Sequence, residues 1–345
     1  MPGRRSYIKP QHSSVSPAYA PGHAPLPAPD GWYCLGLAPE VPPGGVLTRR
    51  LAGEDVVLWR TTDGELNATR PYCPHLGAHL GRGGRVEGRS LVCPFHGFRY
   101  DGRGACTGIA YGTDLITAKL DVLPVTEAGG LILVWHHHAG RGPSWSVPAP
   151  DTAGWSPPVQ SWTEFCGHPQ EILENIVDTG HFTTLHRRIV TGGHVSGVGS
   201  DGETWLTDIH VSIRLPGIRS SSNQVYSMSL HGLGYALGHI ALPGGFTLRV
   251  WVLGTPVDPW RVQLRLVCSV KGRPGRPLSR MQAALVSRVA LYLNAKRFVL
   301  PEDGGDAPVW NTKRYMSVPS LSESDGPVVR YRAWCRQFYP EGTAV

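Results

Sequence analysis

The sequence predicts an α+β protein in which a small all-β domain is followed by a larger domain that combines helices with an antiparallel sheet. Residues 30–145 read as short apolar runs separated by turns that contain Gly and Asp, a pattern typical of β-rich domains. Residues 141–160 contain five prolines and predict a linker. Beyond it, helical patterns stand before and after a series of strands, so we assign the second domain to residues 146–345.

The first 29 residues are predicted to form a disordered tail, because residues 11–29 are rich in Pro, Ala, Ser and His. The extreme N-terminus is basic, but no apolar signal core follows it. No stretch approaches the roughly 20 consecutive apolar residues that a membrane helix needs. We therefore expect a soluble, cytoplasmic protein without a membrane segment.

The strands of the first domain are predicted from apolar runs that end at tight turns. Residues 56–59 (VVLW) form one such run, and residues 62–64 (TDG) follow as a turn. Residues 131–135 (LILVW) form another run, directly after two glycines. These patterns give residues 30–145 their all-β character.

The second domain is predicted to begin with a helix from His168 to about Arg187. Strands then follow over residues 205–215, 224–229, 246–253 and 262–270. A closing helix runs from about Leu278 to Leu300 and repeats large apolar residues at helical spacing, at Met281, Leu285, Val289 and Leu293. This order predicts a helix, an antiparallel sheet and a long closing helix.

Charge and cysteine content argue against a nucleic-acid-binding protein and against a disulfide-stabilised one. The formal net charge is +7 and comes mainly from arginine, since the chain has five lysines. No basic run is interleaved with aromatic residues, so we expect no nucleic-acid partner. The charge serves either general solubility or a basic docking face for an acidic partner. Seven cysteines in a long chain do not resemble a disulfide framework.

Two pairs of cysteine and histidine predict a first metal site. Cys73-x-His75 is followed after seventeen residues by Cys93-x-x-His96. Such paired loops bind either zinc or a [2Fe–2S] cluster. Because each loop combines one Cys with one His, each can donate one ligand to each iron of a cluster that has two Cys on one iron and two His on the other.

This pattern resembles the Rieske family, whose two loops carry C-x-H and C-x-x-H. The Rieske proteins of respiratory complexes have an additional disulfide-forming Cys in each loop, where this chain has Ala78 and Phe95. The resemblance is therefore to the ferredoxin and oxygenase branch. Nearby His79 does not match the phase of the motif, and we interpret it as a loop residue.

A second metal site is predicted in the first helix of the second domain, which contains Asn175, Asp178, His181 and His186. Two residues five apart in a regular α-helix point about 140° away from each other. The helix must therefore be irregular, or end near Gly180, if both imidazoles are to contact one ion. The pattern N-x-x-D-x-x-H-F-x-x-L-H resembles the mononuclear iron motif of Rieske oxygenases, in which two His and one carboxylate hold Fe(II).

The third ligand is assigned to Asp306 by resemblance. The run Asp306-x-x-x-Trp310-x-x-Lys313 resembles a stretch of 3-ketosteroid 9α-hydroxylase oxygenases and cholesterol 7-desaturases, in which the Asp is the ligand. Glu302 and Asp303 are the neighbouring alternatives. Residues 325–339 also resemble the closing segment of this subgroup.

The resemblance implies a fold, cofactors and partners. The second domain would be a helix-grip (START-like) domain, a sheet wrapped around a long helix. Electrons from NAD(P)H would arrive through a ferredoxin or a reductase, and a homotrimer would bring the cluster of one subunit beside the iron of the next. Asp178 matches the bridging carboxylate between a Rieske histidine, here His75 or His96, and an iron-ligand histidine. Asn175 belongs to the same motif and is our second candidate for a catalytic residue.

The predicted activity is O2-dependent oxidation, as a monooxygenase or desaturase, of an apolar, polycyclic, steroid-like substrate. Oxidative cyclisation or hydroxylation of a natural product is an alternative, since the outcome depends on which C–H bond faces the iron. A different class is an electron-transfer protein without oxygenase activity, which would bind no mononuclear iron. The three consecutive histidines at residues 136–138 are interpreted as a solvated loop.

Overall fold

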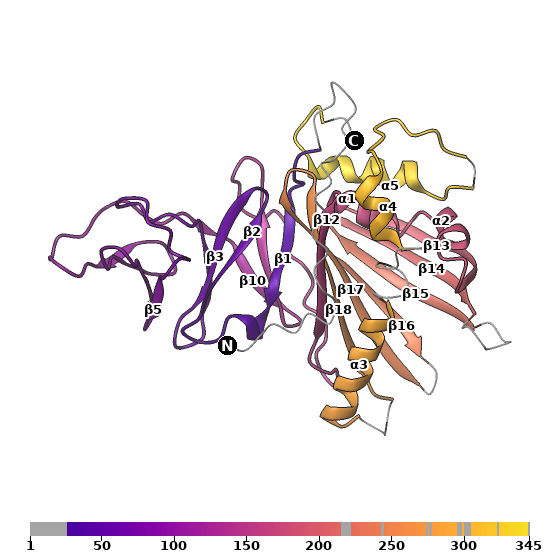
Figure 1. Cartoon of the computed structure of the whole chain (residues 1–345), viewed down its shortest axis with the longest axis horizontal. Helices are drawn as coiled ribbons and strands as arrows, with labels where there is room; N and C mark the ends of the chain where they lie inside the picture. Colours follow the sequence, from indigo (N-terminus) through magenta and orange to yellow (C-terminus); the bar gives the residue numbers. More distant parts are fainter. Residues whose placement is uncertain are drawn as a thin grey trace.

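The computed structural model describes residues 26–214, 222–242, 245–273, 275, 278–294, 299, 305–322 and 324–343. Figure 1 shows the small β-sheets of the N-terminal domain beside one large sheet, with α1, α2, α4 and α5 near one end of this sheet and α3 at the other. The predicted α+β class, with its all-β domain first, is confirmed.

Three small antiparallel sheets make up the N-terminal domain. Their orders are β1-β11-β10, β2-β3-β4-β9 and β5-β6-β7-β8. The predicted runs at 56–59 and 131–135 lie in β3 and β11, and both are completely buried because neighbouring sheets cover them. The strands are β1 (Gly31–Leu37), β2 (Val46–Leu51), β3 (Glu54–Arg60), β4 (Leu66–Thr69), β5 (Arg85–Glu87), β6 (Ser90–Val92), β7 (Arg99–Tyr100), β8 (Cys106–Gly108), β9 (Val122–Leu123), β10 (Val125–Ala128) and β11 (Leu131–His136), with the 3-10 helix η1 (Ala38–Glu40) after β1.

A seven-stranded antiparallel sheet in the order β12-β18-β17-β16-β15-β14-β13 dominates the C-terminal domain. The four predicted strands correspond to β14, β15, β17 and β18. The end of the predicted linker is in fact the start of β12, which pairs with β18 through the whole of its length. The strands are β12 (Val159–Cys166), β13 (Val190–Asp201), β14 (Thr204–Ile213), β15 (Ser222–His231), β16 (Ala236–Leu242), β17 (Phe246–Asp258) and β18 (Arg261–Lys271).

The helix predicted over 168–187 is interrupted, as the spacing of its histidines requires. It consists of α1 (Pro169–Glu174) and α2 (Gly180–Thr184), with a non-helical segment between them. His168 caps α1 by accepting a hydrogen bond from the backbone N–H of Gln170, at 3.2 Å. The chain ends with α4 (Asp306–Thr312), α5 (Val328–Cys335) and the 3-10 helix η3 (Arg336–Phe338).

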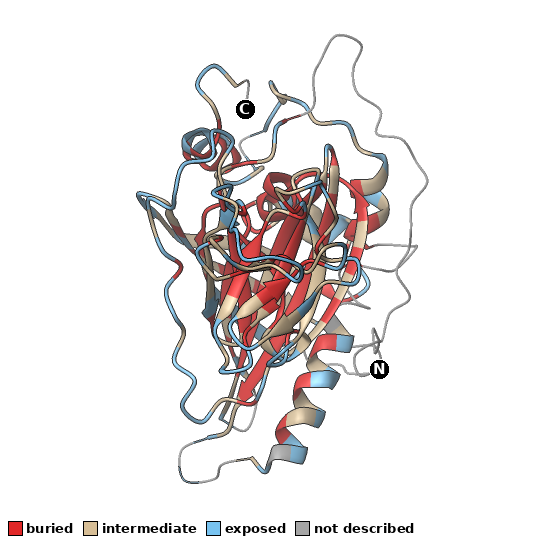
Figure 2. Ribbon diagram, turned by 90° about the vertical axis from the view of Figure 1, so that its left-hand side faces the viewer, coloured by how far each residue is buried: buried red, intermediate tan, exposed pale blue. Residues whose placement is uncertain are grey.

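Helix α3 (Arg280–Asn294) contacts β18 and β12, but not through most of the apolar row that the sequence predicted. The row Met281, Leu285 and Val289 is exposed, whereas Ala283, Ser287 and Leu291 are buried against the sheet. Figure 2 shows this change between buried and exposed colours along α3. The repeat in the sequence therefore marks the outer face of the helix, and small residues allow the inner face to approach the strands closely. The last part of the predicted helix, residues 295–298 and 300, lies outside the described residues.

The two domains share a buried apolar core. Trp32 and Trp135 of the first domain belong to one hydrophobic cluster with Tyr235, Trp251 and Val267 of the second. The indole N–H of Trp251 donates to the Tyr235 hydroxyl at 2.9 Å, so this aromatic core leaves neither group unpaired.

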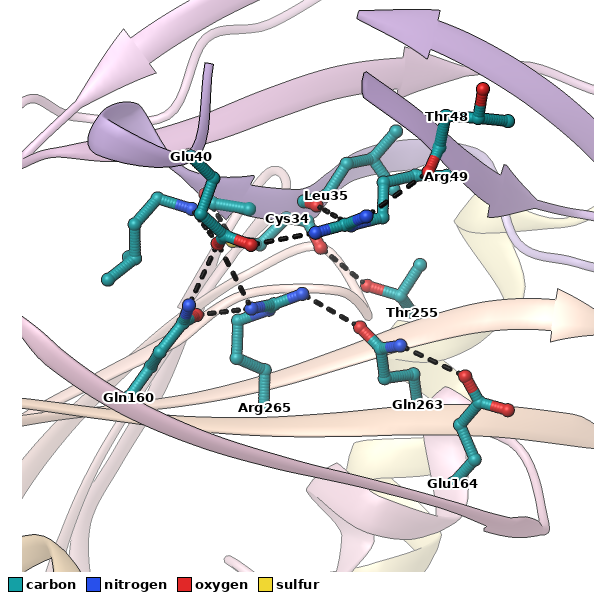
Figure 3. Close-up of polar contacts among 12 residues, drawn as sticks. Cys34, Leu35, Glu40, Thr48, Arg49, Gln160, Glu164, Thr255, Gln263 and Arg265 are labelled. Carbon is teal, nitrogen blue, oxygen red and sulfur yellow. Dashed lines mark hydrogen bonds and ion pairs between the residues drawn. The ribbon is translucent and has the colours of Figure 1, made fainter. Parts of the chain in front are cut away.

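A polar cluster seals the edge of this interface (Figure 3). Glu40 accepts hydrogen bonds from Arg49 and Gln160 at 2.7 and 2.8 Å, and Gln160 in turn accepts one from Arg265, which is 1% exposed. Burial raises the pKa of Glu40, but Arg265, the Leu37 backbone N–H and Gln160 lower it further, so the net pKa is below its ordinary value. Glu40 therefore stays ionised and pairs with the arginines of both domains.

Part of the segment predicted to be a disordered tail is packed against the rest of the protein. Leu26 is buried in the core of the C-terminal domain. The carbonyl oxygen of Pro27 lies 3.1 Å from His168 Nε2, and that of Pro29 accepts a 2.6 Å hydrogen bond from Tyr33. Residues 26–29 are thus packed, and the rest of the predicted tail, residues 1–25, lies outside the described residues. None of the helices in the described part of the chain is long and apolar enough to cross a bilayer.

Candidate metal centres and substrate cavity

The two loops that carry Cys73 and Cys93 have the same backbone construction. In each, the N–H of a glycine four residues after the cysteine bonds back to the cysteine carbonyl, at 2.9 Å for Gly77 and 3.1 Å for Gly97. Both glycines have positive φ, 74° and 69°, a conformation that other residues rarely adopt. Two matched turns therefore present two Cys-His pairs side by side.

The ligand side chains of these loops are arranged as a cluster of two metals would need. Both cysteines are buried, while the rings of His75 and His96 lie 4.8 Å apart, centroid to centroid, and are partly exposed. Burial raises the pKa of the Cys93 thiol, and the backbone N–H groups of Phe95 and His96 act in the opposite direction by hydrogen bonding to its sulfur. Such N–H groups stabilise a thiolate ligand.

The geometry favours two metals over one zinc ion. A single tetrahedral ion would draw all its ligand atoms around one point. Among the described residues, no three of the ligand atoms of Cys73, His75, Cys93 and His96 lie within 4.8 Å of one another. The donor set fits a [2Fe–2S] cluster spread between the loops. His79 is engaged elsewhere, with its Nε2 3.1 Å from Asp55 and its Nδ1 accepting from the Gly81 N–H.

The second site is formed by α2, the segment directly after it, and the start of α4. His181 lies in the first turn of α2, but the helix ends at Thr184, so His186 is free of the regular helical spacing. Asp306 is the first residue of α4. Its side chain reaches the two histidines across more than a hundred residues of intervening sequence.

The three side chains gather around one point. Their ligand atoms all lie within 4.8 Å of one another, with Asp306 Oδ1 3.2 Å from His186 Nε2 and 3.9 Å from His181 Nε2. Asp306 Oδ1 is buried and has no hydrogen-bond partner among the described residues. An unpartnered buried carboxylate oxygen that faces two imidazole nitrogens fits a cation, and two His with one carboxylate are the donors that Fe(II) takes in oxygenases. The alternatives Glu302 and Asp303 lie outside the described residues.

Asp178 fixes the orientation of one of these histidines. Its Oδ2 lies 3.1 Å from His181 Nδ1, and its Oδ1 accepts a 2.9 Å hydrogen bond from the Gly180 N–H. Burial raises the pKa of Asp178, but the bonds from His181 and Gly180 outweigh this effect and hold the pKa below its ordinary value. An ionised Asp178 keeps the proton of His181 on Nδ1, so the lone pair of Nε2 points at Asp306 and the site.

An apolar cavity opens directly from this site. Its empty volume, including the solvent space at its open mouth, is about 960 Å³. Apart from the three ligand residues, Asn175 and Tyr226 are its polar lining. The rest of the wall is apolar and consists of Ile172, Ile176, Phe182, Val190, Ile209, Val211, Met228, Val250, Val252, Leu264, Leu266, Val299 and Trp310.

The surroundings of two wall residues, Phe182 and Tyr226, affect the shape of the cavity and its hydrogen bonding. Gly193 of β13 leaves space for the ring of Phe182, since a Cβ there would lie 2.6 Å from it. Burial raises the pKa of Tyr226 to about 12, so its hydroxyl stays protonated and can donate a hydrogen bond. The sequence could not select these wall residues, because they are ordinary strand residues until the sheet register brings them together.

Two further residues of the motif that begins at Asp306, Trp310 and Lys313, pack close to the site. Trp310 stacks on Phe165, with ring centroids 5.2 Å apart, and lines the cavity. Lys313 lies 3.2 Å from Glu171. Burial raises the pKa of Glu171 more than the contact with Lys313 lowers it, so the net pKa is above its ordinary value. The resemblance noted in the sequence thus covers a metal-ligand candidate, a wall residue and the counter-ion of a buried carboxylate.

A second group of possible metal ligands, Asp30, His137 and His138, is instead held together by hydrogen bonds among its own members. His138 Nδ1 lies 2.8 Å from Asp30 Oδ2, and the His138 backbone N–H donates to Oδ1 at 2.7 Å. His137 Nδ1 accepts from the Ala139 N–H, which leaves its proton on Nε2, 3.5 Å from the same carboxylate. A protonated Nε2 cannot ligate a metal.

Comparisons with known protein families match both domains of the chain. Residues 31–118 match the Rieske [2Fe–2S] domain, and residues 134–339 match the 3-ketosteroid 9α-hydroxylase C-terminal domain. A cholesterol 7-desaturase of Xenopus laevis is 30% identical over 92% of this chain and 73% of its own length. The oxygenase component of a 3-ketosteroid-9α-monooxygenase of Rhodococcus rhodochrous is 29% identical over 92% and 86%.

Solved structures show the same fold. Dicamba monooxygenase bound to 3,6-dichlorosalicylic acid has a TM-score of 0.69 at 18% identity, over 89% of this chain and 96% of its own. The fold and the two ligand sets define an oxygenase of the Rieske type. Within that class, the chain belongs to the family that carries the 3-ketosteroid 9α-hydroxylase C-terminal domain.

Proposed function

We propose that this oxygenase oxidises a steroid or a similar apolar polycyclic molecule at the site formed by His181, His186 and Asp306. The observation that carries the proposal is the position of the three residues on the wall of an almost entirely apolar cavity. Such a cavity binds substrate by shape and by exclusion of water. The named activities of the related 3-ketosteroid monooxygenase and cholesterol 7-desaturase support this substrate class.

The roles of the side chains follow from their contacts. Bound between the loops, a [2Fe–2S] cluster held by Cys73, His75, Cys93 and His96 would supply single electrons, and Fe(II) held by His181, His186 and Asp306 would supply O2 activation. Asp178 keeps the His181 proton on Nδ1. Tyr226 and Asn175 offer the cavity's remaining hydrogen bonds, so a substrate with few polar groups fits best.

Electron delivery is proposed to occur between subunits. Figure 1 shows β5, which lies between the two cluster loops in the sequence, on the opposite side of the molecule from α2 and α4. We infer a homotrimer in which the His75 or His96 edge of one subunit docks near Asp178 of the next, and a separate ferredoxin or reductase that uses NAD(P)H. A cytoplasmic location suits these partners.

Turnover of a steroid tests the proposed substrate class. Reconstituted protein supplied with a reductase, NADH and O2 is expected to convert a 3-ketosteroid or cholesterol to a product one oxygen heavier, or two hydrogens lighter, by mass spectrometry. Conversion of a small polar aromatic acid instead, with none of the polycyclic compounds tested, would contradict it. A cyclised product from a non-steroidal polycycle would favour the biosynthetic alternative.

Metal and sulfide analysis tests the assignment of the first site. Because two Cys and two His divide between two irons in a Rieske centre, purified protein is expected to hold two irons and two labile sulfides there, with a Rieske-type EPR signal on reduction. The matched controls are Cys93→Ser, which should lose the signal, and His79→Asn, which should keep it. Zinc without sulfide would contradict the assignment.

A further inference from the structure

Helix α3 is apolar on both of its faces. Its inner face, built from Ala283, Ser287 and Leu291, is buried on the sheet, and Ser287 Oγ lies 3.0 Å from Ser156 Oγ. The opposite face carries four large apolar side chains at helical spacing: Met281 is 81% exposed, Leu285 63%, Val289 48% and Tyr292 49%. Soluble surfaces rarely expose such a contiguous row unless it binds something.

The net charge of the chain is concentrated in the stretch of sequence that contains the same helix. Residues 271–300 contain seven of the 33 lysines and arginines and none of the 26 aspartates and glutamates. The rest of the chain therefore has 26 of each and no net charge, so the whole formal charge of +7 belongs to this segment. Arg273 and Arg288 are exposed, and neither is paired with a carboxylate of the described residues.

We propose that the outer face of α3 docks on the surface of an acidic phospholipid bilayer. An amphipathic helix with large apolar residues flanked by basic ones is the usual form of such a contact, lying in the plane of the interface. Arg288 lies one turn from both Leu285 and Tyr292, so lipid phosphates and acyl chains can be contacted together. The contact is peripheral and needs no membrane-crossing helix, which agrees with the absence of one among the described helices.

A bilayer suits this face better than an acidic protein or a second copy of the chain. Arg288 stands beside the apolar row without a carboxylate partner among the described residues, so two copies that met through this same face would bring like charges together. The row joins large exposed apolar side chains to an arginine one turn away, which matches acyl chains that lie directly beneath anionic head groups.

Co-sedimentation with vesicles tests the proposal on the full-length protein. Vesicles of phosphatidylcholine with about 30% phosphatidylglycerol are expected to bind the protein much better than pure phosphatidylcholine, because each basic residue near an anionic surface adds about 1 kcal/mol. Raising the salt from about 0.1 to about 0.5 M should weaken the binding by screening. Arg288→Gln should reduce the partition coefficient about fivefold.

The apolar row is tested by the double variant Met281→Gln/Leu285→Gln, which is expected to lower the partition at least tenfold. The matched control is Met316→Gln/Val318→Gln, since these residues are 55% and 84% exposed but lie outside α3. Unchanged binding of the α3 variant, or equal binding to neutral and acidic vesicles, would overturn the proposal. A change in oligomeric mass of the α3 variant, measured by light scattering, would also overturn it and assign the row to another copy. The test needs no turnover, so its result is separate from that of the proposed function.

Discussion

Replacement of Asp306 by alanine is expected to abolish turnover and leave the Rieske spectrum intact. The carboxylate is the only anionic member of the set with His181 and His186, and its buried Oδ1 has no hydrogen-bond partner among the described residues. Two imidazoles alone leave a bound Fe(II) without the third protein ligand of its usual triad. Mononuclear iron measured in excess of the cluster should fall with activity.

The controls for this variant separate a ligand from a nearby charge. Asp303→Ala and Glu302→Ala remove the two neighbouring acids and should keep both iron and activity. Loss of iron in either control, with Asp306→Ala still active, would show that the wrong carboxylate was chosen. Loss of the cluster signal in Asp306→Ala would instead indicate a global defect in folding.

Asp178→Asn is expected to uncouple the two metal sites without emptying either. Asparagine keeps the shape of the side chain but loses the charge that holds the His181 proton on Nδ1, and with it the bridge proposed between subunits. Removing such a supporting partner costs about 10- to 100-fold in affinity or activity at metal sites. The loss can be larger here, because electron transfer between subunits would be interrupted as well.

Single-turnover kinetics decide this second prediction. Reduced Asp178→Asn protein, given substrate and O2, should retain its cluster and iron but fail to oxidise the cluster at the normal rate. Asp325→Asn is a matched control, since Asp325 lies near Gly180 at the start of α2 and bonds to the Ser322 N–H rather than to His181. Cluster oxidation at the wild-type rate in Asp178→Asn would refute the bridging role.

Local patterns predicted much of the fold and only part of the site. The runs at 56–59 and 131–135 were clear because both faces of β3 and β11 are buried. Strand β13 was missed because its sequence, VTGGHVSGVGSD, is rich in Gly and polar residues and only one of its residues is buried. The start of β12 was assigned to the linker because Pro157 and Pro158 directly precede it, although its residues pair fully with β18.

The site residues were likewise predictable from the sequence alone only where the motif lies within one short segment. His181 and His186 were found because their motif is contained in one short segment. Asp306 could be selected only by resemblance to a family, since nothing in the local sequence says that α4 packs beside α2. The orientation of α3 was not evident either, because helical periodicity defines an apolar face without saying whether that face meets the sheet or the solvent.

The shared aromatic core of the two domains determines how electrons can move. A mobile domain on a flexible tether could carry its cluster to a distant acceptor, but Trp32, Trp135 and Trp251 are packed together here and almost completely buried. Pulling the domains apart would expose several such side chains, each at about 1.5–3 kcal/mol or more, and would break the cluster of Glu40 and Arg265 as well. The cluster loops therefore cannot swing toward the iron site of their own chain. In the homotrimer proposed above, each chain would therefore donate electrons to one neighbour and receive them from another, and an isolated subunit would not turn over.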